Sequence, residues 1–271
     1  MPRPVTFLIT AALLAALAAQ GGCLSASSRK KVADSGSLFA AFGPPTPAEA
    51  AAMMADPFDA DKRYKGVTWI SNAPWGGADV YLRVYRELIA NEKEDPGVRA
   101  VSARALAFHG SPADALLIAP LLKSDDKRVR QTAARALQRL NNPAVIPDLI
   151  AVLDSGKEFD RDTRQAAASA LGQYPDPTVL TALIAALNDD ELSVSRTARE
   201  SLRTLTGHDS GEEQKDWQTW AAATTTPFAG QTRYLYPNFE RGKYFWEYIP
   251  LVSPPPNEPA STPIGYRPPG T

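Results

Sequence analysis

The chain has 271 residues, and its 29 Lys and Arg against 30 Asp and Glu give a formal net charge of -1. That balance excludes a nucleic-acid-binding protein that relies on an overall basic field. A single Cys and two His exclude an internal disulfide, thiolate zinc or iron–sulfur sites, and a di-iron site built on repeated His-Glu pairs, so we predict no metal and no cofactor.

Residues 1–22 have the pattern of a secretory signal peptide. Arg3 precedes an uncharged apolar run of about 15 residues from Val5 to Ala19. That length is too short for a helix to span a hydrocarbon core of about 30 Å comfortably, and small residues follow the run, as they do at a signal cleavage site. We therefore predict that the chain is exported.

The only Cys of the chain, Cys23, follows this run and two glycines. The segment resembles the lipobox of bacterial lipoproteins, in which the Cys receives lipid and the chain is cut before it. The Leu that is usual three positions before the Cys is Gln20 here. The resemblance implies lipid attachment at Cys23 and a membrane-anchored, periplasm-facing protein, since several acyl chains anchor stably. The alternative is an ordinary signal peptide with an unrelated Cys.

Two segments lead from this N-terminus to the middle of the chain. Residues 23–46, rich in Ser, Ala, Gly and Pro, predict a flexible tether. Residues 47–77 begin with a capping box, Thr46-Pro47-Ala48-Glu49, that predicts a short helix. We expect the aromatic residues that follow to cover the first repeat, with a ligand groove as the alternative: Phe58, Tyr64, Trp69 and Trp75.

Residues 78–207 contain an internal repeat. Four segments align on one frame without gaps: VRAVSARAL (98–106), VRQTAARAL (129–137), TRQAAASAL (163–171) and VSRTARESL (194–202). Their last residues are Leu106, Leu137, Leu171 and Leu202, which are 31, 34 and 31 residues apart. Each segment predicts the first helix of a repeat, with an apolar face at helical spacing.

A second helix is predicted after each of the first three segments. It begins with a cap residue and Pro, at Ser111-Pro112, Asn142-Pro143 and Asp176-Pro177, because these residue types suit the first positions of a helix. One such hairpin cannot bury its apolar face alone, whereas stacked neighbours can. We predict an all-α fold, a right-handed α-solenoid of stacked helical hairpins.

Charged residues recur in the same frame. An acidic residue lies three positions before the start of each segment, where it favours the helix N-terminus, and an Arg follows the first residue of three segments. We predict that the arginines reach acids of the adjacent repeat in a structural ladder, with a ligand-binding row as the alternative. The ladder residues are Asp95, Arg99, Asp126, Arg130, Asp160 and Arg164.

The frame D-x-x-V-R-x-x-A-A-x-A-L, its period of about 31 residues and the Pro before the second helix resemble HEAT-type repeats, in the short form seen in chromophore-lyase-like proteins. The resemblance covers about residues 78–207. Segments 72–88, 201–220 and 227–259 further resemble the HEAT-repeat lipoproteins of planctomycete-type bacteria. Those relatives are exported and have no assigned reaction, so the resemblance implies fold and location rather than chemistry.

Two segments follow the repeats. Gly207 predicts the end of the last repeat helix, and residues 208–226 predict a capping helix in which Trp217 and Trp220 share one face. Residues 227–271, rich in Pro and aromatic residues, predict an irregular extended arm that ends in a solvated tail. We expect the Trp pair to pack on the last repeat and, together with Trp246, to form a candidate interaction surface.

The sequence lacks the motifs of the common catalytic sites. His208-Asp209-Ser210 contains the residue types of a catalytic triad, but neighbours in one loop do not supply the triad's geometry. His109 is expected to cap a helix end. We therefore predict a non-catalytic, lipid-anchored protein-interaction scaffold of the bacterial cell envelope, with a protein partner there. The alternatives are a lyase- or chaperone-like protein acting through the solenoid groove and a cell-wall-binding structural protein.

Overall fold

The computed structural model describes residues 45–154, 156, 160–237, 242–248 and 258–270. The fold described below is that of the unit Pro47–Thr271. The predicted signal peptide, Cys23 and the tether up to residue 44 lie outside the described residues.

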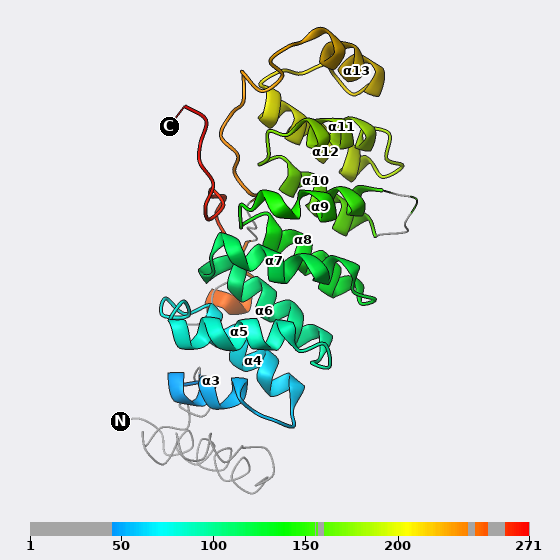
Figure 1. The fold of residues 1–271 in the computed structure, drawn as a ribbon. Coiled ribbons are helices and arrows are strands. Elements are labelled where there is room, and N and C mark those ends of the chain that lie inside the picture. The colour runs from blue at the N-terminus through cyan, green and yellow to red at the C-terminus, as the bar shows by residue number, and fades with distance from the viewer. Residues whose placement is uncertain (1–44, 155, 157–159, 238–241, 249–257, 271) are drawn as a thin grey trace, which may run out of the picture. The chain divides into compact units, whose positions relative to one another are not determined.

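Helices account for most of the described residues. They include α3 (Pro47–Met54), α4 (Ala60–Ser71), α5 (Asp79–Ala90), α6 (Pro96–His109), α8 (Lys127–Leu137), α10 (Arg161–Leu171), α12 (Leu192–Thr206) and α13 (Gln214–Ala223). Helices α4, α6, α8, α10 and α12 each pack on the next, and Figure 1 shows the hairpins stacked in chain order. This unit is therefore an α-solenoid, as the sequence predicts. No helix of the described part has the length and hydropathy of a membrane span.

Proline residues decide how regular the second helix of each repeat is. The first is broken into three short turns, η2 (Pro112–Asp114), α7 (Ala115–Ile118) and η3 (Ala119–Lys123), and Pro120 lies at the second break. The second divides into η4 (Pro143–Val145) and α9 (Ile146–Leu153), where Pro147 opens α9. The third has Pro at its start alone and is one helix, α11 (Pro177–Ala186). An internal Pro lacks the N–H that a helix needs and clashes with the preceding turn.

The repeats share one apolar interior. Leu106, Leu137, Leu171 and Leu202 are all 0% exposed and belong to one contiguous core cluster. Burying a leucine side chain contributes about 2 to 3 kcal/mol. The predicted continuous seam is confirmed.

The N-terminal part covers the first repeat in a different way from the one the sequence predicts. Phe58 is 95% exposed, and the other three aromatic residues are 40–46% exposed. Helix α4 instead turns Val67 and Ile70, both 0% exposed, toward the core, because residues three apart share a helix face. Gly66 lets α3 pack closely on α4, because a Cβ at this position would clash with the backbone nitrogen of Met54, at 2.3 Å.

Candidate functional site

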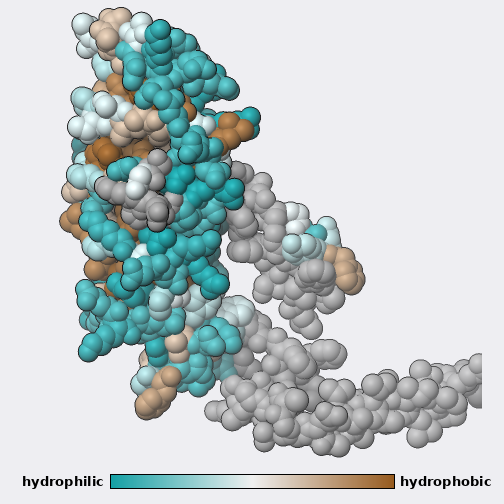
Figure 2. All heavy atoms as spheres, turned by 90° about the vertical axis from the view of Figure 1, so that its right-hand side faces the viewer, coloured by the Kyte–Doolittle hydropathy of each residue, from teal (hydrophilic) through white to brown (hydrophobic). Residues whose placement is uncertain are grey.

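The acids of the predicted ladder are helix caps. Asp95, Asp126 and Asp160 each accept two backbone N–H hydrogen bonds from the first turn of their own helix, at 2.7–3.4 Å. Those N–H groups have no partner inside the helix, and the carboxylates lie at the positive end of its dipole. Figure 2 faces the edge of the array at which these helices begin, and its surface is mainly hydrophilic.

Two arginines of the predicted ladder bind backbone carbonyls. Arg99 Nε donates to the carbonyl of Ile89 at 3.2 Å, and Arg130 Nη1 donates to that of Ser124 at 2.6 Å. The prediction that Arg99 reaches an acid of the adjacent repeat is wrong: its guanidinium binds a carbonyl in the last turn of α5, and the predicted acids cap their own helices.

The third arginine of the predicted ladder, Arg164, does find a carboxylate. It forms a two-point ion pair with Asp189, at 2.7 and 2.9 Å, and the two side chains are 10% and 3% exposed. Asp189 precedes the next repeat helix and is not one of the predicted capping acids. This buried pair joins α10 to the loop that follows α11.

His109 caps a helix end, and the helix is not its own. It is the last residue of α6, and its Nε2 lies 2.7 Å from the carbonyl oxygen of Ser71, the last residue of α4. Since a carbonyl only accepts hydrogen bonds, Nε2 must carry the proton. His109 therefore fixes the end of α4 to the end of α6.

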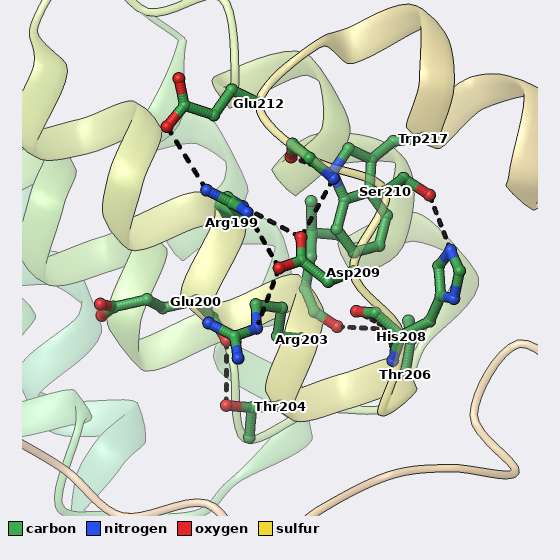
Figure 3. Close-up of polar contacts among 12 residues, drawn as sticks. Arg199, Glu200, Arg203, Thr204, Thr206, His208, Asp209, Ser210, Glu212 and Trp217 are labelled. Atoms are coloured by element: carbon green, nitrogen blue, oxygen red, sulfur yellow. Dashed lines mark hydrogen bonds and ion pairs between the residues drawn. The ribbon is translucent and has the colours of Figure 1, made fainter.

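His208, Asp209 and Ser210 do not form a triad (Figure 3). Asp209 turns to Arg199, at 2.9 and 3.0 Å, and to Arg203 at 3.4 Å, and the hydrogen bond from Arg199 holds the pKa of Asp209 below its ordinary value. His208 Nε2 lies 2.9 Å from Ser210 Oγ, with no carboxylate behind it in this loop. Nowhere in the described residues do three His, Cys, Asp or Glu side chains lie together as a metal site.

The tryptophans predicted as an interaction surface lie in different places. Trp217 is 0% exposed, and its indole N–H donates to the carbonyl of Gly211 at 2.9 Å, so it is a core residue and that prediction is wrong for it. Trp220 is half-buried and stacks on His208 at 4.8 Å. The side chain of Trp246 lies outside what the structure describes.

Residues 228–236, the first tail segment, run back along the array from α13 (Figure 1). The N–H of Thr232 donates to the carbonyl of Thr204 in the last turn of α12, at 2.8 Å. Tyr234 is only 4% exposed, and burial raises the pKa of its phenol. The segment therefore satisfies a helix-end carbonyl that has no partner within the helix, and its Phe228 packs against the core.

Residues 258–266, the second tail segment, also lie on the repeats. The N–H of Ile264 donates to the carbonyl of Arg139 at 2.7 Å, and its carbonyl accepts from the N–H of Asn141 at 2.9 Å. The N–H of Tyr236 donates to the carbonyl of Ser261 at 3.0 Å, so the two tail segments pair in antiparallel fashion. The predicted solvated tail is wrong for these residues.

A carboxylate clamp fixes the start of the second tail segment. Glu258 forms ion pairs with Arg104, at 2.8 Å, and with Arg139. The two guanidinium groups lie 4.5 and 4.7 Å from the ring centre of Phe108, and Arg139 also lies 4.3 Å from that of Tyr236. Planar guanidinium groups suit carboxylate and aromatic partners together.

Polar side chains hold this surface in place. Gln173 donates to the carbonyl of Leu137 at 3.0 Å and accepts from the side chain of Asn141 at 3.0 Å. The N–H of Asn142 donates to the hydroxyl of Tyr174 at 3.1 Å, and burial raises the pKa of Tyr174 to about 12. These contacts tie the end of α8 to the end of α10. We call Arg104, Phe108, Arg139, Leu140 and Asn141 the tail surface.

Sequence reasoning did not find the tail surface. Arg104 and Arg139 fall outside the repeated D-x-x-V-R frame, and the Pro-rich composition of residues 254–271 points to a solvated tail. One signal was present, because the segment after 227 is too rich in aromatic residues for simple disorder.

An array of helical hairpins that holds an extended segment along the ends of its helices belongs to the class of α-solenoid interaction scaffolds. A family model described as HEAT repeats matches residues 84–162 and, overlapping with them, 115–203. Residues 84–203 of this chain are HEAT repeats.

Two further comparisons add little. A solved structure of human deoxyhypusine hydroxylase in complex with glycerol is similar over 61% of this chain and 88% of that chain, with 15% sequence identity and a TM-score of 0.31. At that TM-score the similarity says nothing more about this chain. A search of curated proteins found no significant match, and the resemblance to planctomycete-type lipoproteins stays a prediction.

Proposed function

We propose that this protein is a non-catalytic, lipid-anchored interaction scaffold of the cell envelope, in which the HEAT repeats hold extended peptide segments of a protein partner. The observation that carries the proposal is the tail surface. It binds an extended segment through the backbone at Ile264 and through a carboxylate at Glu258. Binding of this kind suits a scaffold, because backbone groups give affinity and a few side chains give selectivity.

Anchoring rests on the N-terminal sequence. An apolar run of signal-peptide length ends just before the only Cys, and acylation at Cys23 with two or more chains would give stable membrane attachment. The exported, periplasm-facing location is part of the same proposal.

Labelling with a palmitate analogue tests the anchor. We expect the label to enter the wild-type protein and the membrane fraction to contain it, and we expect a Cys23→Ala variant to lose both. Equal labelling of the variant, or no labelling of the wild type, contradicts lipid attachment. Cross-linking in intact envelopes followed by pull-down then identifies the partner.

A cell-wall-binding role has one observation in its favour. Residues 245–248 form a short 3-10 turn, η6 (Phe245–Tyr248), in which Phe245 is 81% and Tyr248 is 71% exposed. Exposed aromatic rings suit stacking on sugar rings. A Phe245→Ala, Tyr248→Ala double variant keeps the buried first tail segment, and loss of co-sedimentation with purified cell wall would support this second role. Unchanged sedimentation would exclude these two rings from it.

A further inference from the structure

The two tail segments are held to different degrees. In the first, Tyr234 is 4% exposed, and its backbone N–H donates to the hydroxyl of Tyr266 in the second segment at 3.1 Å. In the second, Pro263 is the buried residue, while Glu258, Ile264 and Tyr266 are half-buried and the residues between them are mostly exposed. Segments with few buried apolar contacts open at low free-energy cost. The first segment is therefore part of the fold, and the second is held weakly on its surface.

We infer that the tail surface is a docking site for an extended acidic peptide of a partner protein, and that residues 258–266 occupy it as an exchangeable intramolecular ligand. This inference rests on the proposed scaffold function and names the chemistry of its partner. The surface contributes two cations, Arg104 and Arg139, and the carbonyl of Arg139 and N–H of Asn141 remain to be paired when the tail leaves.

The bound segment shows what the site recognises. The peptide needs a carboxylate for the two arginines and, six residues later, a residue whose N–H and carbonyl both pair with the backbone that follows α8. The next residue must be Gly, because Gly265 has φ +83° and a Cβ there would lie 2.4 Å from Pro112. A side chain is both strained and blocked in that position.

A partner peptide has to compete with residues 258–266 for the tail surface. Residues 237–257 connect the two tail segments, and a ligand tethered to its own binding site competes at an effective concentration on the order of millimolar. A partner must therefore bind more tightly than the tail or be present at high local concentration. Release of the tail increases the apparent affinity for any peptide that uses the same contacts.

A labelled peptide of residues 257–270 tests the exchange against the full chain. Fluorescence anisotropy should show weak binding to the wild type and binding about tenfold tighter or more to a Glu258→Arg variant, because Arg at 258 is repelled by Arg104 and Arg139. A Glu258→Arg, Arg139→Ala double variant should lose that gain. Equal affinity of the wild type and the Glu258→Arg variant would overturn the inference.

Exchanging the charges at positions 139 and 258 tests whether the clamp recognises the peptide or only supports the fold. A full chain with Arg139→Glu should prefer a peptide carrying Glu258→Arg over the wild-type peptide, with circular dichroism confirming its helix content. If that variant unfolds, Arg104→Ala is made in the Glu258→Arg chain, whose tail is already released, and should weaken binding of the wild-type peptide relative to Glu258→Arg alone. No change of preference or affinity contradicts the clamp. Concentration-dependent dimers that Glu258→Arg dissociates would identify a second copy as the occupant and refute a partner peptide.

The peptide assay is independent of the anchor. Peptide exchange by a chain that takes up no palmitate would refute the envelope location and leave the docking site in place. A lipid-labelled chain that shows no exchange would refute the docking site alone.

Discussion

At the scale of single residues, the buried ion pair between Arg164 and Asp189 should be the most sensitive polar contact in the array. Its side chains are 10% and 3% exposed, and removing one partner of such a pair leaves a buried charge. We expect Arg164→Ala to lower the free energy of unfolding in urea by about 3 to 5 kcal/mol.

The matched control is Arg199→Ala. It removes a pair with Asp209 whose side chains are about a third exposed, and solvent screens such pairs, so the loss should be much smaller. If the two substitutions cost the same, burial does not determine the strength of these pairs.

Asp209 should make the protein sensitive to acid. The hydrogen bond from Arg199 lowers its pKa in the folded chain below the ordinary 3.8. As the pH falls, the unfolded chain takes up the proton first, so the stabilisation is complete above that value and is lost as the pH falls through the lowered pKa. Melting temperatures measured between about pH 7 and pH 3 should therefore fall less steeply for Asp209→Asn than for the wild type. An equally steep fall would show that other carboxylates determine the acid response.

At the scale of elements, the end of α12 depends on a left-handed glycine. Gly207 has φ +67°, and a Cβ there would lie 2.1 Å from the carbonyl oxygen of Gly230 in the first tail segment. Gly207→Ala should cost about 1 kcal/mol for the backbone conformation and more for the displaced tail, as measured by urea unfolding. Gly211 has φ +87° with open space around its Cβ position, so Gly211→Ala should show the backbone cost alone. Equal losses would mean that the tail does not press on Gly207.

The first helices of the repeats could be predicted because their leucines and caps recur in one frame, and Leu106 and Asp95 behave as that frame requires. The sequence also contains the cause of the break in the first repeat's second helix, because Pro120 lies inside that helix. The position of the second tail segment could not be predicted from the sequence, because Ile264 binds a backbone group, the carbonyl of Arg139. Every residue type has a backbone carbonyl, so a contact to it is not visible in the sequence.

At the scale of the whole molecule, the stacked repeats should behave as coupled neighbours. Each hairpin of a solenoid contacts mainly the units beside it, so its stability is its own plus the interfaces that it shares. Helix α8 contacts both α6 and α10, and the tail surface combines residues of α6 with residues that follow α8. Docking of a peptide there should therefore stabilise two adjacent repeats together.

Leu137→Ala tests this coupling. Leu137 is 0% exposed on α8, and the cavity should cost about 2 to 5 kcal/mol. Because the loss falls on an element shared by two interfaces, hydrogen exchange should accelerate in α6 and α10 as well as in α8. Leu116→Ala, at a residue 54% exposed, should change exchange in its own turn at most. Acceleration confined to α8 would mean that each hairpin is stable without its neighbours, and the solenoid would then lack the cooperative seam on which the tail surface depends.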